Sequence, residues 1–394
     1  MEEVKLTLAQ FERYQTIKKA LAGDLTNERA AKALRLSIRQ VQRLKPRVKQ
    51  EGASGVIHGN TGRRPHNAIP PASKEQVIRL AMNDYRNYNF SHLSDTLAEE
   101  HKLNISDETL RLWLRPLGMG KTQRRLKKHR RRRKRREHEG ELLFLDGSPH
   151  LWFGPDQPEV CLLLSSDDAT GKPLWGKFQP NEDRNGCFEV CYQVFKKFGL
   201  AAAFYLDMAS QFTTTRHGGT HVKQGPEVDK THFEIAMQQL AIDLIFARSP
   251  QARGRGERLN GSFQNRLAAE LQRKGLKDCR AATKYLNRVF IPKYQKWFAQ
   301  KPADPRSAWR PVPKELNLKS VLSAKHERVV ANDNTISFEA EAYQLTPPPG
   351  RSHLLHARIQ VQEHFDGTLH FIHPKLGELK GKKIEFDQKR KQVA

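Results

Sequence analysis

Two short apolar runs in the middle of the chain each end in an aspartate, and this feature constrains the fold most. LLFL precedes Asp146, and FYL precedes Asp207. Runs of this length and polarity are typical of buried strands, which present the next polar side chain at the edge of a sheet. The middle of the chain therefore predicts an α/β domain with two carboxylates at one sheet edge.

A third acid, Glu257, stands at a predicted helix start within SPQARGRGERLNGSF. Carboxylates gathered at one edge repel each other unless divalent cations lie between them, and such oxygen ligands suit Mg²⁺ or Mn²⁺. Two such ions can stabilise both the attacking and the leaving oxygen of a phosphodiester displacement. Asp146, Asp207 and Glu257 are therefore candidate catalytic and metal-binding residues of a site that cuts and joins DNA.

Other acids remain alternatives for this site. Asp243 begins an apolar run instead of ending one, and Glu234 falls inside the helix predicted before it, so each is a weaker third ligand. Asp167 and Asp168 follow a strand whose end should turn toward the opposite edge. Their position favours a role in forming a turn.

Histidines near the candidate residues allow more than one interpretation. His150 follows Asp146 closely, where it can orient a ligand, contact DNA or pack against neighbours. His217 and His221 have HxxxH spacing, but the glycines between them disfavour a helix. We therefore expect a loop near the substrate there and no zinc pair.

The charge of the chain indicates a polyanionic partner. Its 394 residues include 69 Lys and Arg against 43 Asp and Glu, a formal net charge of +26. Because neutralising phosphates releases condensed counterions, nucleic acid is the expected partner. No apolar run is long enough to predict a membrane span, and the start lacks a secretion signal, so we expect a cytoplasmic protein.

Cysteine usage agrees with a reducing compartment. Four cysteines without a CxxC pair predict neither a disulfide framework nor a zinc site. Cys187 and Cys191 lie one helical turn apart, and this spacing predicts that both pack on the buried side of a helix.

Sequence punctuation divides the chain into four folded parts and a basic linker. We expect a helix-turn-helix domain over 1–65, a second over 66–120, the α/β core with trailing helices over 141–310 and a small β-barrel over 325–380. The linker, 121–140, contains KTQRRLKKHRRRRKRR, in which twelve residues are Lys or Arg. Such a block repels itself until phosphates screen it, which predicts a non-specific DNA clamp. A solvated linker is the alternative. The clamp would include Arg130, Arg131, Arg132 and Arg133.

The first helical part has the pattern of a DNA-reading motif. Leu8 to Leu21 predicts a helix closed by Gly23, Thr26 or Asn27 can cap the next, and Ser37 caps the third. Apolar residues at helical spacing on the third helix leave polar ones outward, where they can reach base edges in the major groove. A small bundle with a charged face is the alternative. The outward residues are Arg39, Gln40, Gln42 and Arg43.

Two further features concern the helical region. Pro46 should kink or shorten the third helix, because it lacks an amide donor and clashes with the preceding turn. The Gly-, Pro- and Arg-rich stretch GNTGRRPHN is expected to lie along DNA through Arg63 and Arg64.

The second part should contain three short helices, with a capping box at Ser73 and Gln76 and further starts near Ser91 and at Ser106.

The order of elements after Glu141 predicts an RNase H-like core. Strands are expected at 142–145, 160–165, 173–178, 201–206 and 243–246, with helices around Phe188 to Phe195, Thr231 to Leu240 and from Gly256. In that fold the first and fourth strands are neighbours. Asp146 and Asp207 would then meet at one edge, and the helix with Glu257 would cross nearby.

Four ordered segments resemble the DDE transposases of bacterial insertion sequences, which have a retroviral-integrase-like core. They are DGSPH at 146–150, SDDATG at 166–171, LDMASQF at 206–212 and SPQARGRGERLNGSFQNRL at 249–267. The last is the most specific, because it resembles the family's SPQxxGxxER(x)N signature. The resemblance covers the whole chain, although the gap between Asp207 and Glu257 is longer than in many relatives.

The resemblance implies both residue roles and an activity. Asp146, Asp207 and Glu257 correspond to the triad that holds two Mg²⁺ ions, and Arg258 and Asn260 flank it and can meet DNA. Water would attack at the transposon end, and the freed 3′ hydroxyl would then attack target DNA. Double-stranded DNA, as terminal inverted repeats and target, and at least two protomers on paired ends are the implied partners. A DNA-binding regulator with a degenerate integrase fold, or a nuclease that never joins strands, is the alternative.

The remainder of the chain predicts packing and a small β domain. Trp113 and the series Tyr285, Phe290, Tyr294 and Trp297 are expected to pack. From about 325 the apolar residues alternate, and Asp366-Gly367 predicts a hairpin turn, so a small barrel fits. The closing KGKKIEFDQKRKQVA reads as a frayed basic tail.

Overall fold

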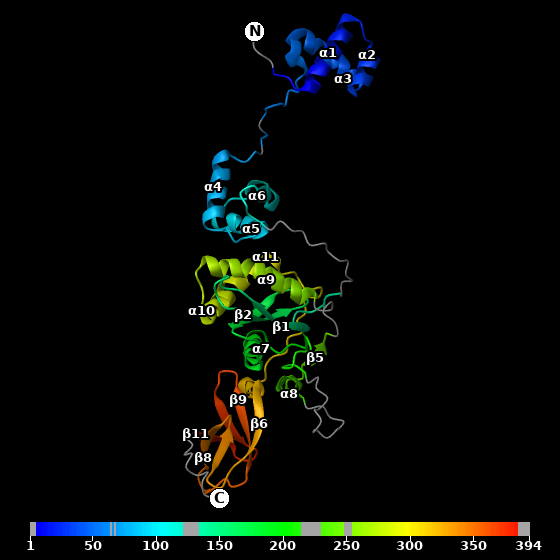
Figure 1. Ribbon diagram of the computed structural model, residues 1–394. Coiled ribbons are helices and arrows are strands. Elements are labelled where there is room, and N and C mark those ends of the chain that lie inside the picture. Colours follow the sequence, from blue (N-terminus) through cyan, green and yellow to red (C-terminus); the bar gives the residue numbers. More distant parts are fainter. Residues whose placement is uncertain are drawn as a thin grey trace, which may run out of the picture. The chain divides into compact units, whose positions relative to one another are not determined.

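A computed structural model describes residues 5–63, 65–66, 68–120, 134–213, 230–247 and 254–384 (Figure 1). The chain divides into two compact units, 1–76 and 77–394, and each is described by itself. Within the described part, no helix has the length and apolar character needed to cross a membrane. Several predicted residues lie outside the described residues: Arg64, Arg130, Arg131, Arg132, Arg133, His217 and His221.

The first unit holds three capped helices, α1 (Leu8–Ala22), α2 (Asn27–Leu34) and α3 (Ile38–Glu51). The predicted caps are confirmed. Thr26 and Ser37 each accept a hydrogen bond from a backbone amide of the first turn, and Gly23 closes α1 at φ 90°, a backbone conformation that favours glycine. Ile17 and Val41 are fully buried between the helices.

Pro46 was predicted to kink or shorten the third helix, and the helix is not shortened. α3 continues through Pro46 to Glu51. The proline and Gln42, whose carbonyl loses its amide partner there, are both exposed, so water can satisfy that carbonyl. Val41 and Val48 are buried on the opposite side, and their packing holds the helix together across the proline.

Three more helices follow, α4 (Pro71–Asn83), α5 (Phe90–Glu100) and α6 (Asp107–Leu114), of which α4 lies across the boundary between the units. Ser106 caps α6 as predicted. The start near Ser91 is confirmed, because α5 begins at Phe90, whereas the start at Ser73 is not. Ser73 lies inside α4, so it forms no capping box, and α5 is capped by Asn89 because its side chain accepts the His92 amide at 2.8 Å.

A five-stranded mixed sheet forms the centre of the second unit. Its strands are β1 (Leu142–His150), β2 (Val160–Asp167), β3 (Pro173–Gln179), β4 (Ala203–Leu206) and β5 (Asp243–Phe246), in the order β3-β2-β1-β4-β5. β1 to β3 pair antiparallel, whereas β4 and β5 run parallel to β1. The predicted strands are confirmed, and so is the adjacency of the first and fourth. β1 does not end at Asp146, because its pairing with β2 continues to His150.

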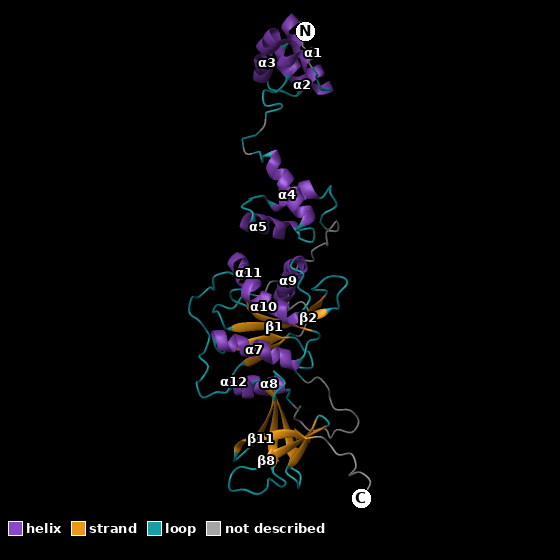
Figure 2. Cartoon of the chain, turned by 90° about the vertical axis from the view of Figure 1, so that its left-hand side faces the viewer, coloured by secondary structure: helices purple, strands orange, loops and turns teal. Residues whose placement is uncertain are grey.

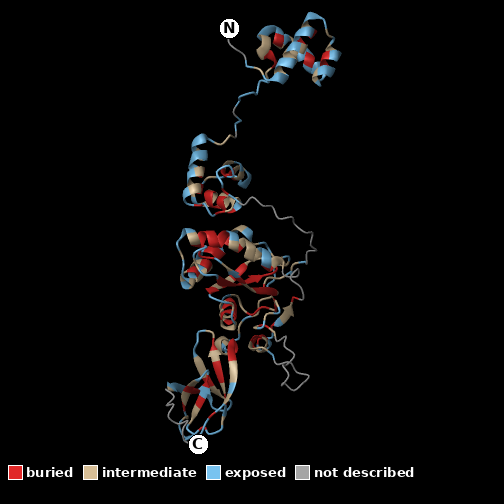
Figure 3. Ribbon diagram, viewed as in Figure 1, coloured by how far each residue is buried: buried red, intermediate tan, exposed pale blue. Residues whose placement is uncertain are grey.

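Helices cover both faces of this sheet (Figure 2). α7 (Arg184–Phe198) and α8 (His232–Gln239) pack on one face, whereas α9 (Gly254–Arg273), α10 (Cys279–Tyr285) and α11 (Ile291–Phe298) pack on the other. β2 is therefore buried along its whole length (Figure 3). Cys187 and Cys191 are buried on α7, as their spacing predicted. A π-helical turn, Leu286–Phe290, joins α10 to α11.

The chain ends in a six-stranded antiparallel sheet preceded by α12 (Leu318–Val321). Its strands are β6 (Ser323–Val329), β7 (Thr335–Phe338), β8 (Glu341–Thr346), β9 (Arg358–His364), β10 (Leu369–His373) and β11 (Gly377–Ile384), in the order β6-β9-β10-β11-β8-β7. The sheet is a half-barrel, because β6 and β7 form its two ends and do not pair to close it. Asp366-Gly367 makes the predicted turn. The predicted frayed tail was wrong up to Ile384, because β11 pairs there with β8.

Candidate active site

The paired part of β1 and β4 ends two residues before Asp146 and Asp207. The parallel pairing runs from Leu142 opposite Ala203 to Phe144 opposite Tyr205. The rings of that last pair contact each other at 5.7 Å between centroids, so both project from one face. Asp146 is two residues further along β1, and Asp207 directly follows the end of β4, so an extension of this register by two residues would bring both aspartates to that face.

The N-terminal half of α9 lies against this end of β1. Asn260 donates its side-chain amide to Asp146 Oδ2 at 2.8 Å, and one turn later Gln264 donates to the Ser148 hydroxyl at 3.0 Å. A Cβ added at Gly256 would lie 3.5 Å from Asp146 Oδ2, so the helix approaches the carboxylate closely. Asn260 was predicted to meet DNA, whereas its side chain here orients Asp146.

Glu257 stands in the first turn of α9 and is exposed. Gly256, the preceding residue, lies on the helix face that approaches Asp146. Because successive residues of a helix are rotated by about 100°, the Glu257 side chain points away from that face. Among the described residues, no three His, Cys, Asp or Glu side chains are grouped so that they can hold a metal ion. The role of Glu257 as a third ligand therefore stays a prediction.

The alternative acids have other positions. Glu234 takes part in a capping box at the start of α8, where its carboxylate accepts the Thr231 amide at 2.7 Å. Asp243 pairs with Ala203 at the beginning of β4, so it lies at the opposite end of the parallel strands from Asp207. Asp167 forms a turn as predicted, since its carboxylate accepts hydrogen bonds from Gly140 and Thr170.

Glu182 was missed by sequence reasoning, although it lies beside the candidate site. A Cβ at Gly147 would collide with Glu182 Oε2 at 2.0 Å, so glycine lets this carboxylate approach the face of β1 opposite Asp146. Glu182 also accepts a hydrogen bond from Gln211, four residues after Asp207. It therefore ties the loop after Asp207 to β1. Its place between β3 and α7 gave no signal of this contact in the sequence.

Asp168 connects the end of β2 to the first turn of α9. Its buried carboxylate forms an ion pair with Arg255 and accepts the Arg136 backbone amide at 2.8 Å. Its backbone carbonyl accepts a hydrogen bond from Arg135 at 2.7 Å. The sequence predicted only a turn here, because nothing in it shows that Arg255 comes within reach.

Replacement of Asp168 with Asn is expected to loosen the start of α9. The substitution keeps the shape of the side chain but removes the charge opposite Arg255, so we expect a loss of about 1–3 kcal/mol in the free energy of unfolding. Faster hydrogen exchange in the first turns of α9 measures the local effect. Glu137→Gln, which breaks an exposed pair with Lys134, is the matched control and should change little. Equal exchange in the two variants would contradict a clamping role for Asp168.

A buried polar cluster holds α5 against the middle of α9. His92 and Glu270 are almost fully buried, and His92 Nε2 lies 3.0 Å from Glu270 Oε1. Tyr285 donates to the same carboxylate, and Lys293 Nζ lies 3.4 Å from it. Arg266 adds an ion pair with Asp95 at 2.8 Å.

The protonation states in this cluster follow from the contacts. Burial alone would raise the pKa of Glu270, but hydrogen bonds from His92 and Tyr285 and the charge of Lys293 outweigh it and lower the pKa to about 2. Burial lowers the pKa of His92. A neutral His92 that donates from Nε2 fits the geometry, because its buried Nδ1 has no hydrogen-bond partner and would carry a proton if the ring were charged.

The described candidates for DNA contact are exposed. Arg39, Gln42 and Arg43 project from α3, and Arg63 lies in the stretch after it. Gln40 is also exposed, but its side-chain oxygen accepts the Ser37 amide in the capping box, so only its amino group is left to reach a base. Arg258 is exposed on α9 and donates to the Gly254 carbonyl at 2.9 Å. Contact of these side chains with DNA stays a prediction.

Comparison with known proteins gives no matching family model. Two solved structures match part of the chain at low TM-score. The HTLV-2 integrase catalytic core domain in complex with magnesium has a TM-score of 0.28 and 15% identity, covering 39% of this chain and 89% of its own. The simian T-cell lymphotropic virus intasome in complex with the PP2A regulatory subunit B56 gamma has a TM-score of 0.33 and 12% identity, covering 68% and 86%.

Two sequence relatives match almost the whole chain. A putative transposase, y4bF, of Sinorhizobium fredii (strain NBRC 101917 / NGR234) is 31% identical over 368 residues, which cover 93% of this chain and 79% of the relative. The transposase for insertion sequence IS1202 of Streptococcus pneumoniae is 30% identical over 394 residues, covering 91% and 83%. With this identity over most of both relatives, the chain belongs to the family of insertion-sequence transposases.

Proposed function

We propose that this transposase binds the ends of its insertion sequence, hydrolyses a phosphodiester at the 3′ end and joins the freed 3′ hydroxyl to target DNA. The observation that carries the proposal is the parallel register of β1 and β4, whose extension by two residues would align Asp146 with Asp207, together with the contact of α9 with Asp146. The net charge of +26 supports a polyanionic substrate.

The donor chemistry at this edge fits Mg²⁺ better than a softer metal. Asp146 and Asp207 offer only carboxylate oxygens, and Glu257 in the first turn of α9 can supply a third after its side chain turns toward them. Bound Mg²⁺ ions would stabilise charge on the attacking and leaving oxygens. Asn260 holds the Asp146 carboxylate in one orientation, as hydrogen-bond partners of metal ligands do.

Recognition of the ends is assigned to the helical region. Arg39, Gln42 and Arg43 on α3 would reach base edges, and Arg63 would hold phosphates. Arg130, Arg131, Arg132 and Arg133, which lie outside the described residues, are proposed to hold phosphates as well. Arg258, beside Glu257, would contact DNA close to the reaction. We further propose that at least two protomers act together, because two ends must be brought to one target.

A joining assay tests the proposal. Full-length protein is incubated with Mg²⁺ and a labelled duplex taken from the DNA that flanks its gene, and products are separated on a denaturing gel. We expect both nicked ends and longer, joined strands, and neither in the presence of EDTA. Nicks without joined strands would instead indicate a nuclease.

Specific binding without any cleavage would indicate a regulator with a degenerate integrase fold. One observation favours this second candidate: the carboxylates of the described residues do not form a ready three-ligand group. The register of Asp146 and Asp207 favours the enzyme, because a regulator gains nothing from aligning two carboxylates.

A further inference from the structure

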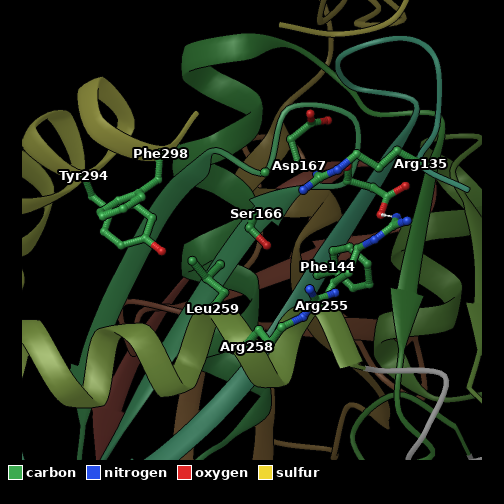
Figure 4. A pocket seen from close by; sticks show the side chains of 11 residues that line it. Arg135, Phe144, Ser166, Asp167, Arg255, Arg258, Leu259, Tyr294 and Phe298 are labelled. Atoms are coloured by element: carbon green, nitrogen blue, oxygen red, sulfur yellow. Dashed lines mark hydrogen bonds and ion pairs between the residues drawn. The ribbon is translucent and has the colours of Figure 1, made fainter. Parts of the chain in front are cut away.

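A cavity of about 170 Å³ lies beside the candidate active site, between the ends of β1 and β2 and the helices α9 and α11. Phe144, Leu259, Tyr294 and Phe298 form its apolar wall, and Arg135 and Arg258 lie at its charged side. Figure 4 shows Tyr294 and Phe298 on one side of this space and Arg135 on the other. None of the proposed catalytic residues lines it.

The apolar wall leaves an aromatic surface accessible. Phe144 and Tyr294 are almost buried, but Phe298 keeps 40% of its surface exposed at the end of α11. The Tyr294 ring packs against Phe298 at 4.7 Å between centroids, and the Arg266 guanidinium lies 4.7 Å from the Phe298 ring centre. Phe298 is thus held in place by its neighbours while part of it stays open to solvent, an arrangement on which a planar base can stack.

The charged side has more cations than anions, because Arg135, Arg255 and Arg258 line it together with only two carboxylates, Asp167 and Asp168. Arg135 donates to the Asp168 carbonyl and Arg258 to the Gly254 carbonyl, and neither forms an ion pair with a described residue. Asp168 is already paired with Arg255. Burial lowers the pKa of Arg135 and the charges of Arg255 and Arg258 lower it further, whereas Asp168 and Asp167 act in the opposite direction without cancelling the shift. An anion placed between these guanidinium groups would relieve their repulsion.

The position and size of the cavity limit its ligand. Phe144 precedes Asp146 by two residues on the same face of β1, a distance of about 7 Å along a strand. Leu259 directly precedes Asn260, which contacts Asp146. The volume is below the roughly 300–1,000 Å³ of drug-sized sites, so one heterocyclic ring fits and a stacked pair of bases does not.

We propose that this cavity binds one extrahelical base of the DNA substrate, with the flanking phosphates on Arg135 and Arg258. The inference rests on the proposed function, because it makes DNA the ligand. Enzymes that take a base out of the stack hold it between aromatic or apolar side chains, and this wall offers such a surface. A base held there would fix the position of the strand next to Asp146.

Photo-crosslinking tests the proposal without the need for catalysis. Full-length protein carrying Asp146→Ala is mixed with a duplex that contains one bulged 5-iodouracil nucleotide, or with the same duplex in which that nucleotide is paired. After irradiation the adducts are mapped by mass spectrometry. We expect adducts on peptides containing Tyr294 or Phe298 with the bulged duplex and few with the paired one.

Binding affinity gives a second readout. Phe298→Ala is expected to weaken binding of the bulged duplex by about 5- to 100-fold, the range for loss of one aromatic–base stack, and to change the paired duplex little. Phe298→Trp should retain the preference. Val289→Ala, which also removes an exposed apolar side chain, is the matched control, and circular dichroism checks that each variant is folded.

Three results would overturn the proposal: adducts that map elsewhere, adducts equal for bulged and paired duplexes, or no bulge preference in the unsubstituted protein. The outcome is separable from that of the joining assay. If adducts form at Tyr294 or Phe298 but the unsubstituted protein never nicks DNA in the joining assay, the base-binding cavity is supported and the proposed enzymatic function is rejected. If the joining assay gives joined strands but no such adducts form, the enzymatic function is supported and the base-binding cavity is rejected.

Discussion

Replacement of Asp146 or Asp207 with Asn is expected to lower both nicking and joining by roughly 10³-fold or more, the scale for residues that act as a catalytic unit. Asn keeps the size of the side chain but removes the negative charge that a metal ligand at this edge needs. Binding of end DNA should stay within about 2-fold, because recognition is assigned to other parts of the chain. Rates of nicked and joined product from a labelled duplex measure the first effect, and filter binding measures the second.

Two acids of the same unit serve as matched controls. Asp243→Asn changes the opposite end of the parallel strands, and Glu234→Gln keeps the capping box, because Gln also serves at that position. Both variants should retain near-normal rates. Glu257→Gln then tests the third metal ligand. If it lowers the nicking and joining rates as much as Asp146→Asn does, Glu257 is the third ligand, whereas such a loss of rate in Glu234→Gln would assign that role to Glu234. Normal joining by Asp146→Asn would refute the proposed site altogether.

Glu270→Ala is expected to destabilise the packing of α5 on α9 by about 3–5 kcal/mol, the usual effect of removing one partner from a buried ionic cluster. The variant leaves His92, Tyr285 and Lys293 without their shared acceptor in a buried place. Hydrogen exchange of the backbone amides in α5 and α9 reports the local free energy, which suits a chain of several parts better than a single melting temperature.

Glu108→Ala provides the comparison, because its ion pair with Arg111 is exposed on α6. Such surface pairs contribute at most about 1 kcal/mol, so exchange should change little. Glu270→Gln keeps a hydrogen-bond acceptor and should fall between the two. If Glu270→Ala and Glu108→Ala have the same exchange rates, the buried cluster does not hold α5 on α9.

Local sequence was enough to predict most of the secondary structure. Caps such as Thr26, Ser37 and Ser106 were predicted correctly, because a cap depends on a side chain and an amide two or three residues away. The five core strands follow from apolar runs of the right length. Errors arose where a competing local signal lost to packing, as at Pro46, or where pairing partners extended a strand, as at the end of β1.

The sequence by itself determined the basic character, the positions of the core strands and the ordered motifs behind the family resemblance, because apolar runs and charged motifs are local properties. The pairing of the first and fourth strands was expected only from that resemblance. Only the tertiary structure decided which distant groups meet: Asn260 with Asp146, Glu182 against Gly147, Asp168 with Arg255 and His92 with Glu270. Each of these contacts joins residues from 35 to 178 positions apart (182−147 and 270−92), and such pairs depend on how helices pack on the sheet. Packing is set by the shape of the whole core, which no local stretch of residues specifies.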